Sequence, residues 1–299
     1  MQDLDSISIN FDQNQVILLN ICLGILMFGV ALDLKVSDFK YVLKNPKAVI
    51  AGMISQLILL PLITLVLVWI IRPEYSLAMG MILIAACPGG NVSNYAVHLA
   101  GANAALSVIL TMISTLICAF STPFIFTQLR KAIPSSIDQT IDFDISFGDM
   151  IITIGQLIVI PLIIGYLMNA YLPQITSRLR KPIKNISFII FIGFVVAAIA
   201  GNLENLKNYL GIVFFIVLVH NTLALLIGFS WTRYLIKLPA VDAQTISIET
   251  GIQNSGLALI LIFNYFNGTG GMALIAAWWS VWHLLSALGL AFIWKKQVA

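Results

Sequence analysis

Long apolar runs that do not alternate with polar residues are the feature that most constrains this chain. Residues 16–31 and 188–200 are examples. In a bilayer, only helices and closed barrels satisfy all the backbone polar groups. Because barrel strands alternate apolar and polar residues in segments of about 10, these runs predict membrane-spanning α-helices. The composition agrees, since 60% of the 299 residues are hydrophobic and only 10% are charged.

Nine segments reach the length of roughly 20 apolar residues that a spanning helix needs. The predicted fold is therefore an all-α polytopic membrane protein. The three cysteines lie inside apolar runs and are expected to be buried thiols without a disulfide framework. Residues 1–13 lack the lysine or arginine that opens a signal peptide. The nine predicted spans are residues 14–33, 47–71, 77–100, 103–128, 149–172, 184–202, 208–231, 243–266 and 271–294.

The distribution of lysine and arginine between the two sets of span ends predicts the orientation, because cytoplasmic loops are enriched in both. The two sets carry 12 and 4 of the 16 basic residues. We expect the richer set to be cytoplasmic, which places the N-terminus outside and the C-terminus inside and requires an odd number of spans. The short tails favour a bacterial inner-membrane protein. The richer set is Lys35, Lys40, Lys44, Lys47, Arg178, Arg180, Lys181, Lys184, Arg233, Lys237, Lys295 and Lys296.

Two spans are interrupted near the centre of the membrane. Residues 87–94 read CPGGNVSN and residues 249–256 read ETGIQNSG. Proline removes a backbone donor and glycine weakens a helix. Backbone groups freed at that depth persist only where protein or a watery cavity surrounds them. A kink is the simpler interpretation of one such span, but two in corresponding places are typical of a transporter site.

The interruptions divide the chain into two expected repeats of inverted orientation. Residues 1–133 form the first repeat with four spans, and residues 149–299 form the second with five. Residues 134–148 are predicted to be an external linker loop. The first repeat is then one helix short of its partner.

Glu249 is the acidic residue that no loop or span end accounts for. The other 12 of the 13 acidic residues lie in tails, loops or at a span end, and no lysine or arginine is expected at the depth of Glu249. An unpaired charge there costs about 2.5–3.5 kcal/mol on insertion scales. A proton or a bound cation would neutralise it, and a purely structural protonated carboxyl that caps broken-helix amides is the alternative.

The polar neighbours of Glu249 favour a hard cation, which prefers oxygen ligands. Ser107 and Thr111 are four residues apart and share a helix face, although back-bonding to the preceding turn would explain that pair alone. Half-helix N-termini near Asn91 and Asn254 would face an anion with their positive dipole ends. His283 follows three tryptophans and is expected at the same cavity, whereas His98 and His220 are interpreted as structural. The oxygen donors at membrane depth are Gln56, Ser93, Asn94, Ser107, Thr111, Gln253 and the carbonyls of Thr250 and Ile252.

At these residues the sequence resembles the bile acid/sodium symporter family along nearly its whole length. The resemblance implies a panel domain of spans one, five and six. It also implies a core domain of spans two to four and seven to nine, in which the two broken helices cross. The segments that carry the resemblance are residues 27–29 (MFG), Gln56, residues 87–90 (CPGG), Ser93, Asn94, residues 105–107 (ALS), 249–254 (ETGIQN) and 280–283 (SVWH).

The resemblance also implies two sodium ions and an organic anion as cargo. One sodium site would use Ser93, Asn94, Ser107, Thr111 and Glu249. The other would use Gln56, Glu249, Gln253 and the carbonyls of Thr250 and Ile252. The substrate candidates are Asn91, Asn254 and His283.

The predicted function is sodium-coupled symport of a bile acid-like or small carboxylate anion by alternating access. The alternative is a cation/proton antiporter of similar crossed-helix fold, although such a protein is expected to carry more than one membrane carboxylate. An enzyme is not expected, because no catalytic motif lies at a suitable depth. The expected partners are the organic anion and the lipid bilayer, without nucleic acid or an obligate protein partner.

Overall fold

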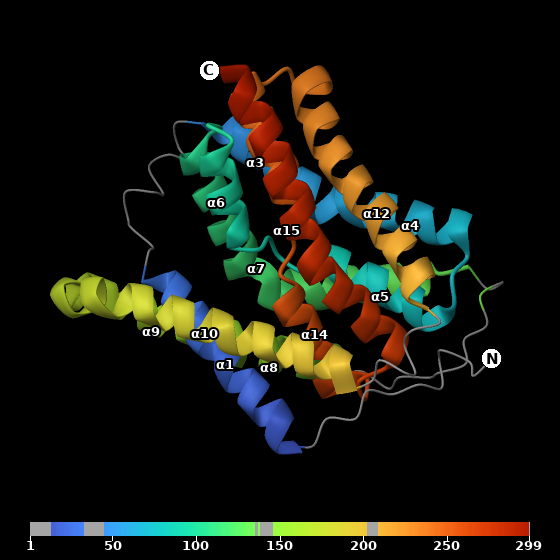
Figure 1. The fold of residues 1–299 in the computed structure, drawn as a ribbon, viewed down its shortest axis with the longest axis horizontal. Coiled ribbons are helices and arrows are strands. Elements are labelled where there is room, and N and C mark those ends of the chain that lie inside the picture. The colour runs from blue at the N-terminus through green and yellow to red at the C-terminus, as the bar shows by residue number, and fades with distance from the viewer. Residues whose placement is uncertain (1–12, 33–44, 135–136, 138–145, 202–208, 299) are drawn as a thin grey trace.

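The computed structural model describes residues 13–32, 45–134, 137, 146–201 and 209–298. Within these residues the chain is helical and contains no strand, apart from one isolated antiparallel bridge between Gly89 and Gln253 (Figure 1). The helices are α1 (Gln13–Ala31), α3 (Pro46–Ile54), η2 (Ser55–Leu59), α4 (Leu60–Ile71), α5 (Tyr75–Ala86), α6 (Val92–Leu99), α7 (Ala104–Lys131), α8 (Phe147–Ile154), η3 (Gly155–Val159), α9 (Ile160–Tyr171), α10 (Pro173–Gly201), α12 (Leu210–Ser230), η4 (Trp231–Leu235), α13 (Ala240–Gly251), α14 (Ser255–Tyr265) and α15 (Gly270–Val298).

Five continuous helical stretches in the described part of the chain are long and apolar enough to cross a membrane. Three shorter apolar helices accompany them, at Val16–Gly29, Tyr75–Ala86 and Ser255–Tyr265. Two of the short helices, α5 and α14, belong to the interrupted spans. The long stretches are Pro46–Ile71, Ala104–Lys131, Phe147–Tyr171, Leu210–Leu235 and Gly270–Lys295.

Two of the long stretches contain a π-helical turn before a proline. Residues 55–63 read SQLILLPLI and residues 155–163 read GQLIVIPLI, and in both the π-turn covers the first five positions. In a regular α-helix the ring of Pro61 would clash with the carbonyl of Leu57. The wider turn removes that clash and keeps the helix continuous.

The two predicted interruptions are present. Helix α5 ends at Ala86 and α6 begins at Val92, while α13 ends at Gly251 and α14 begins at Ser255. The two connecting segments lie against each other, because Gly90 N donates to Ile252 O at 3.0 Å and Asn254 N donates to Pro88 O at 2.8 Å. Each break therefore supplies hydrogen-bond partners for the other.

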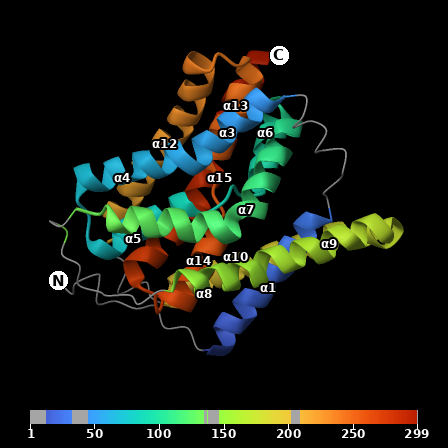
Figure 2. The same ribbon diagram turned by 180° about the vertical axis from the view of Figure 1, so that it is seen from behind.

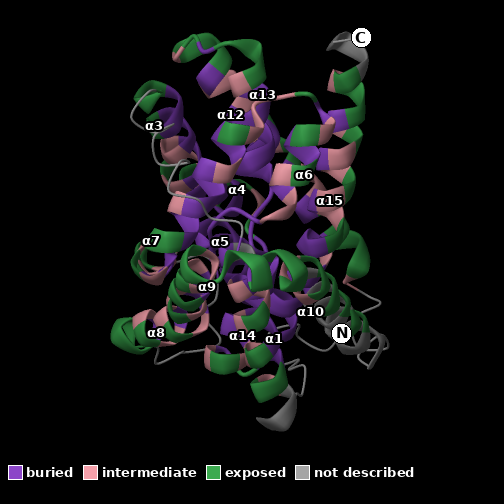
Figure 3. Cartoon of the chain, turned by 90° about the vertical axis from the view of Figure 1, so that its left-hand side faces the viewer, coloured by how far each residue is buried: buried purple, intermediate pink, exposed green. Residues whose placement is uncertain are grey.

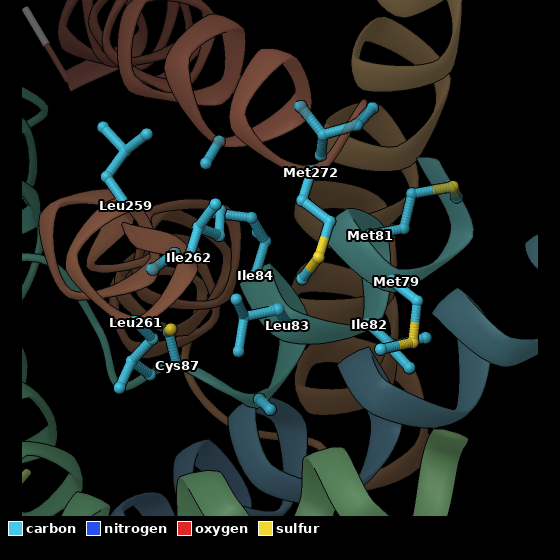
Figure 4. Close-up of a cluster of buried hydrophobic side chains, with 14 of the residues drawn as sticks. Met79, Met81, Ile82, Leu83, Ile84, Cys87, Leu259, Leu261, Ile262 and Met272 are labelled. Atoms are coloured by element: carbon cyan, nitrogen blue, oxygen red, sulfur yellow. The ribbon is translucent and has the colours of Figure 1, made fainter. Parts of the chain in front are cut away.

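Helix α5 is the centre of the apolar core. All 12 of its residues are buried, as expected for a helix that is apolar on every face. Its side chains pack with those of α14 and α15, including Leu83, Leu261 and Met272 (Figure 4). The outer helices instead expose large apolar side chains such as Ile70 and Ile189, and Figure 3 shows buried residues inside and exposed residues outside.

Helices α1, α9 and α10 pack on one another and lie together on one side of the molecule (Figures 1 and 2). Helix α1 also packs on α14, and α8 packs on α7. Helix α10 differs from the expected span at 184–202, since it already begins at Pro173. The basic residues from Arg178 to Lys181 therefore lie on a helix and not in a loop. Proline suits the first helical turn, and residues 174–181 contain no helix breaker.

The contact between the two interruptions would crowd a side chain at Gly90. A Cβ there would lie 3.0 Å from Gln253 O and 3.0 Å from Ile252 Cγ2. We predict that Gly90→Ala destabilises the protein by about 1–3 kcal/mol, the usual cost of overpacking. Thermal unfolding in detergent measures this as a lower melting temperature.

Gly155→Ala is the matched control for Gly90→Ala, because a Cβ at Gly155 meets no atom within 4 Å. This variant is expected to melt like the wild type. Equal melting temperatures for the two variants would show that the two interruptions are not in close contact.

Candidate functional site

Glu249 lies on α13, two residues before the helix ends, and its side chain is completely buried. Ser93 Oγ and Ser107 Oγ both donate to Oε1 of its carboxylate. Thr111 Oγ1 lies 3.0 Å from Oε2, and Gln56 Nε2 lies 3.3 Å from the same oxygen. The described partners of this carboxylate are therefore four neutral side chains, which leave its charge without a counter-charge.

Local sequence explains why these hydroxyls meet at Glu249. Asn103 caps α7 by accepting a hydrogen bond from Leu106 N at 3.1 Å, so Ser107 stands in the first turn. Thr111 follows on the same face one turn later. Helix α6 begins just after the first interruption and places Ser93 in its own first turn. Two helix starts thus direct their hydroxyls toward the end of α13.

Glycine allows the first interruption to approach the carboxylate. A Cβ on Gly89 would lie 3.0 Å from Gln56 Nε2 and 3.3 Å from Glu249 Oε2. The Gly89 amide donates to Ser114 Oγ at 3.2 Å. A larger residue at this position would push the backbone away from Glu249.

Gln56, Gln253 and the backbone around Glu249 supply a second group of oxygen atoms. Gln56 Nε2 donates to Glu249 O at 3.0 Å, and Gln253 Nε2 donates to Thr250 O at 3.0 Å. Both glutamine side chains are at least 97% buried, yet Gln56 Oε1 and Gln253 Oε1 have no hydrogen-bond partner. A buried acceptor without a partner costs about 1–3 kcal/mol, so two of them beside one carboxylate indicate a place for a cation.

The chemistry of this cluster fits a hard cation, which binds carboxylate, hydroxyl and carbonyl oxygens. The described residues contain no group of three or more histidine, cysteine, aspartate or glutamate side chains that could hold a metal. The described cysteines Cys22, Cys87 and Cys118 are free and buried, as the sequence predicted.

The structure brings the nine predicted cation ligands into one region. Of the eight besides Glu249, some contact its carboxylate directly and others do not. Asn94 Oδ1 accepts from Ser107 Oγ at 2.8 Å, so Asn94 reaches the carboxylate only through Ser107. Ile252 O accepts from Gly90 N, and a carbonyl oxygen has a second lone pair for another partner.

A cavity of about 90 Å³ lies beside the two interruptions. All three predicted substrate residues, Asn91, Asn254 and His283, line it. Asn254 also caps α14 by accepting from Leu257 N at 3.0 Å. His283 is 5% exposed, and its Nδ1 has no hydrogen-bond partner. The remaining lining residues are Leu23, Leu26, Met27, Gly90, Val92, Ile252, Gln253, Ser255, Gly256, Ser280 and Leu284.

Three polar residues at the site were not predicted from the sequence. Ser55 Oγ lies 2.7 Å from Thr250 Oγ1, Ser114 accepts from Gly89 N, and Asn221 Nδ2 donates to Gly251 O at 2.7 Å. Ser114 follows Ser107 by seven residues, so helical spacing alone could have identified it. Ser55 directly precedes Gln56, and Asn221 lies between His220 and Thr222, but no spacing in the sequence links Ser55 or Asn221 to Glu249.

His220 has the structural environment that the sequence suggested. It is fully buried, its Nε2 lies 2.6 Å from Thr64 Oγ1, and its ring packs edge-on against Trp279. His98, in contrast, is exposed on α6.

The long apolar helices define a multi-pass helical membrane protein, and its oxygen cluster surrounds a completely buried carboxylate. Residues 20–209 match the model of the sodium bile acid symporter family. The chain belongs to this family.

The relatives found by sequence comparison are described as transporters. An uncharacterized sodium-dependent transporter of Bacillus subtilis, YocS, is 34% identical over 281 residues, which are 94% of this chain and 84% of that protein. A probable chloroplast sodium/metabolite cotransporter of rice is 28% identical, over 94% of this chain and 64% of the relative. A probable chloroplast sodium/metabolite cotransporter of Arabidopsis thaliana is 30% identical, over 92% of this chain and 66% of that protein. The chain spans about two thirds of the length of these plant relatives.

Thr111 is the hydroxyl residue that lies within hydrogen-bonding distance of both carboxylate oxygens of Glu249. We predict that Thr111→Val raises the Na⁺ concentration needed for half-maximal thermal stabilisation about tenfold, a free energy of about 1.4 kcal/mol. Titration of the purified protein with Na⁺ against a K⁺ background measures this effect.

Thr115→Val is the control, since the Thr115 hydroxyl only donates to Thr111 O at 2.6 Å in the preceding turn. It is equally buried and is expected to keep the wild-type Na⁺ response. Equal responses of the two variants would remove Thr111 from the cation site.

Proposed function

We propose that this protein is a secondary active transporter that couples the symport of a small organic anion to Na⁺. The observation that carries this proposal is the completely buried Glu249 carboxylate with neutral partners alone, beside the unpartnered oxygens Gln56 Oε1 and Gln253 Oε1. Na⁺ would supply the missing charge and the missing ligand contacts together. The printed descriptions of the Bacillus and plant relatives as sodium-dependent or sodium/metabolite transporters support the same ion.

Two ions would use the whole donor set, since the donors comprise a hydroxyl-rich group from α6 and α7 and a group of glutamine side chains and backbone carbonyls. The first proposed site has Ser93, Asn94, Ser107, Thr111 and Glu249. The second has Gln56, Glu249, Gln253 and the carbonyls of Thr250 and Ile252. Two Na⁺ ions and one carboxylate leave a net charge of about +1. This charge would attract an anion into the adjacent cavity.

The cavity supports a small carboxylate as substrate more than a molecule of bile acid size. Its volume is about 90 Å³, whereas drug-sized ligands occupy pockets of about 300–1,000 Å³. Leu23, Leu26 and Met27 of α1 provide apolar lining, and the N-terminal ends of α6 and α14 also line the cavity. Helix N-termini stabilise anions, so the carboxylate would face α14 and the apolar end would face α1. Asn91, Asn254 and His283 would orient it.

The proposed topology has nine spans in two inverted repeats, with the N-terminus outside and the C-terminus in the cytoplasm of a bacterial cell. Residues 1–133 and 149–299 are the proposed repeats, and the linker at 134–148 lies mostly outside the described residues. The panel would contain α1, α8, η3, α9 and α10, and the core would contain the remaining helices. The packing of α1 on α9 and α10 supports this division.

Alternating access would move the panel against the core. The described side-chain hydrogen bonds that join the panel to the core involve the last two residues of α14. Asn20 of α1 and Asn264 of α14 exchange hydrogen bonds at 3.3 and 3.0 Å. The next residue, Tyr265, contacts the Thr153 hydroxyl and donates to Asp149 O at 2.8 Å, both in α8. The other end of α14 lines the cavity. Breaking these contacts would allow the outer side of the cavity to open.

Glu249→Ala is expected to abolish Na⁺-dependent uptake and leave a folded protein, since it removes the negative charge shared by both proposed sites. The assay uses proteoliposomes and an organic anion selected by thermal-shift screening in Na⁺ against K⁺. Normal Na⁺-dependent uptake by this variant would contradict the sodium-site assignment.

Cross-linking tests the proposed movement directly. In a chain whose Cys22, Cys87 and Cys118 are replaced, we predict that a short bifunctional thiol reagent joins Asn20→Cys to Asn264→Cys and stops uptake. Na⁺-induced thermal stabilisation should persist, because neither residue contacts the cation ligands. The single-cysteine variants are the controls, and uptake at the wild-type rate by the cross-linked protein would show that α1 and α14 do not separate during transport.

A further inference from the structure

The carbonyl groups at the end of α13 each accept a hydrogen bond, and one donor, Asn221, lies outside both proposed sodium sites. Glu249 O accepts from Gln56, Thr250 O accepts from Gln253, and Ile252 O accepts from Gly90 N. The carbonyl of Gly251 instead accepts from Asn221 Nδ2 at 2.7 Å. Asn221 lies in the middle of α12, an unbroken helix that packs along α13.

Both ends of the Asn221 amide are occupied. Its Oδ1 accepts from Ser286 Oγ of α15 at 2.6 Å, and the side chain is completely buried. These two hydrogen bonds fix the orientation of the buried amide, because rotating it would place Oδ1 against Gly251 O, two acceptors with no proton between them. Ser286 is three residues from His283 and lies 3.2 Å from its carbonyl oxygen. Asn221 therefore connects the end of α13 to the helix that forms one wall of the cavity.

Helix α12 also approaches Gly251 closely. A Cβ on Gly251 would lie 2.7 Å from Leu225 Cγ, and Leu225 follows Asn221 by one turn on the same face of α12. Glycine permits this approach, but its backbone has more conformational freedom than that of any other residue. The hydrogen bond from Asn221 limits that freedom at the point where the helix ends.

We propose that Asn221 is a positioning residue for the second sodium site. Gly251 lies between Thr250 and Ile252, whose carbonyls are the proposed backbone ligands of that site. Rotation of the peptide unit at Gly251 would turn the carbonyls on both sides of it. Asn221 holds that unit, and Ser286 holds Asn221, so cation binding and the α15 wall of the cavity are connected through one amide. This inference rests on the proposed function.

The test compares Asn221→Leu with Thr222→Val, using Na⁺ alone as the probe. Leucine is similar in size to asparagine but makes neither hydrogen bond, whereas Thr222 is the next residue on α12 and is exposed. Purified protein is titrated with Na⁺ and separately with Li⁺ in a K⁺ background, and the half-saturating concentration for thermal stabilisation is measured. Ser286→Ala, which leaves the bond from Asn221 to Gly251 possible but lets the amide rotate, completes the series.

We expect Asn221→Leu to raise the Na⁺ half-saturating concentration about tenfold and Ser286→Ala about threefold. The ratio of the Li⁺ to the Na⁺ value should also change in Asn221→Leu, because displaced carbonyls alter the size of the site. Thr222→Val should match the wild type. Asn221→Ala replaces the leucine variant, with the same expectation, if the latter does not fold.

A purely structural role would lower the melting temperature in K⁺ but leave the Na⁺ half-saturation and the Li⁺ ratio unchanged, and that result would overturn the inference. An unchanged Na⁺ value in Ser286→Ala would overturn the link to α15. A wild-type protein that responds equally to Na⁺ and K⁺ would contradict the proposed function itself. The failure of that function is therefore distinguishable from a failure confined to Asn221.

Discussion

The structure depends on one carboxylate that is buried among neutral groups. Glu249 has hydroxyl and amide donors around it but no described cationic partner. A charge in this position is stable only if a proton or a cation accompanies it. Three of its four side-chain partners are hydroxyl oxygens, and two buried amide oxygens nearby lack any hydrogen-bond partner. These features favour a bound cation over a permanently neutral acid, because a proton would satisfy Glu249 alone and leave Gln56 Oε1 and Gln253 Oε1 as they are.

The two helix interruptions solve a backbone problem and create the site at the same time. Each break frees amide and carbonyl groups that lipid cannot satisfy. Pro88 O and Ile252 O accept hydrogen bonds from backbone amides of the opposite break. Gln56 and Asn221, which lie in continuous helices, donate to Glu249 O and Gly251 O. The contacts between the two breaks, and that of Gln56 with Glu249, bring together residues separated by more than 150 positions in the chain. Glycine at positions 89 and 90 permits this close approach, because a Cβ at either position would meet neighbouring atoms at 3.0 Å.

The sequence was sufficient to predict the helical class, the positions of both interruptions and the isolated position of Glu249. Apolar run length and the CPGG and ETGIQN segments determine these features locally. The family resemblance was needed to divide the oxygen donors between two ions and to expect that both breaks meet. Ser55 and Asn221 could not be assigned to the site from one sequence, because their roles arise from packing between distant helices. The sequence also did not predict that α10 begins at Pro173. The basic residues after Pro173 are typical of a loop between spans, but they are equally compatible with an amphipathic helix.

The most direct test of the central claim is a measurement of ion movement during uptake. Proteoliposomes that contain the purified protein are supplied with radioactive Na⁺ and with an organic anion selected by Na⁺-dependent thermal stabilisation, while internal pH is recorded. The account predicts that Na⁺ enters together with the anion, at about two ions per anion if both proposed sites are used. Anion uptake that proceeds equally in K⁺, or Na⁺ entry that is matched by proton exit without an anion, would contradict it.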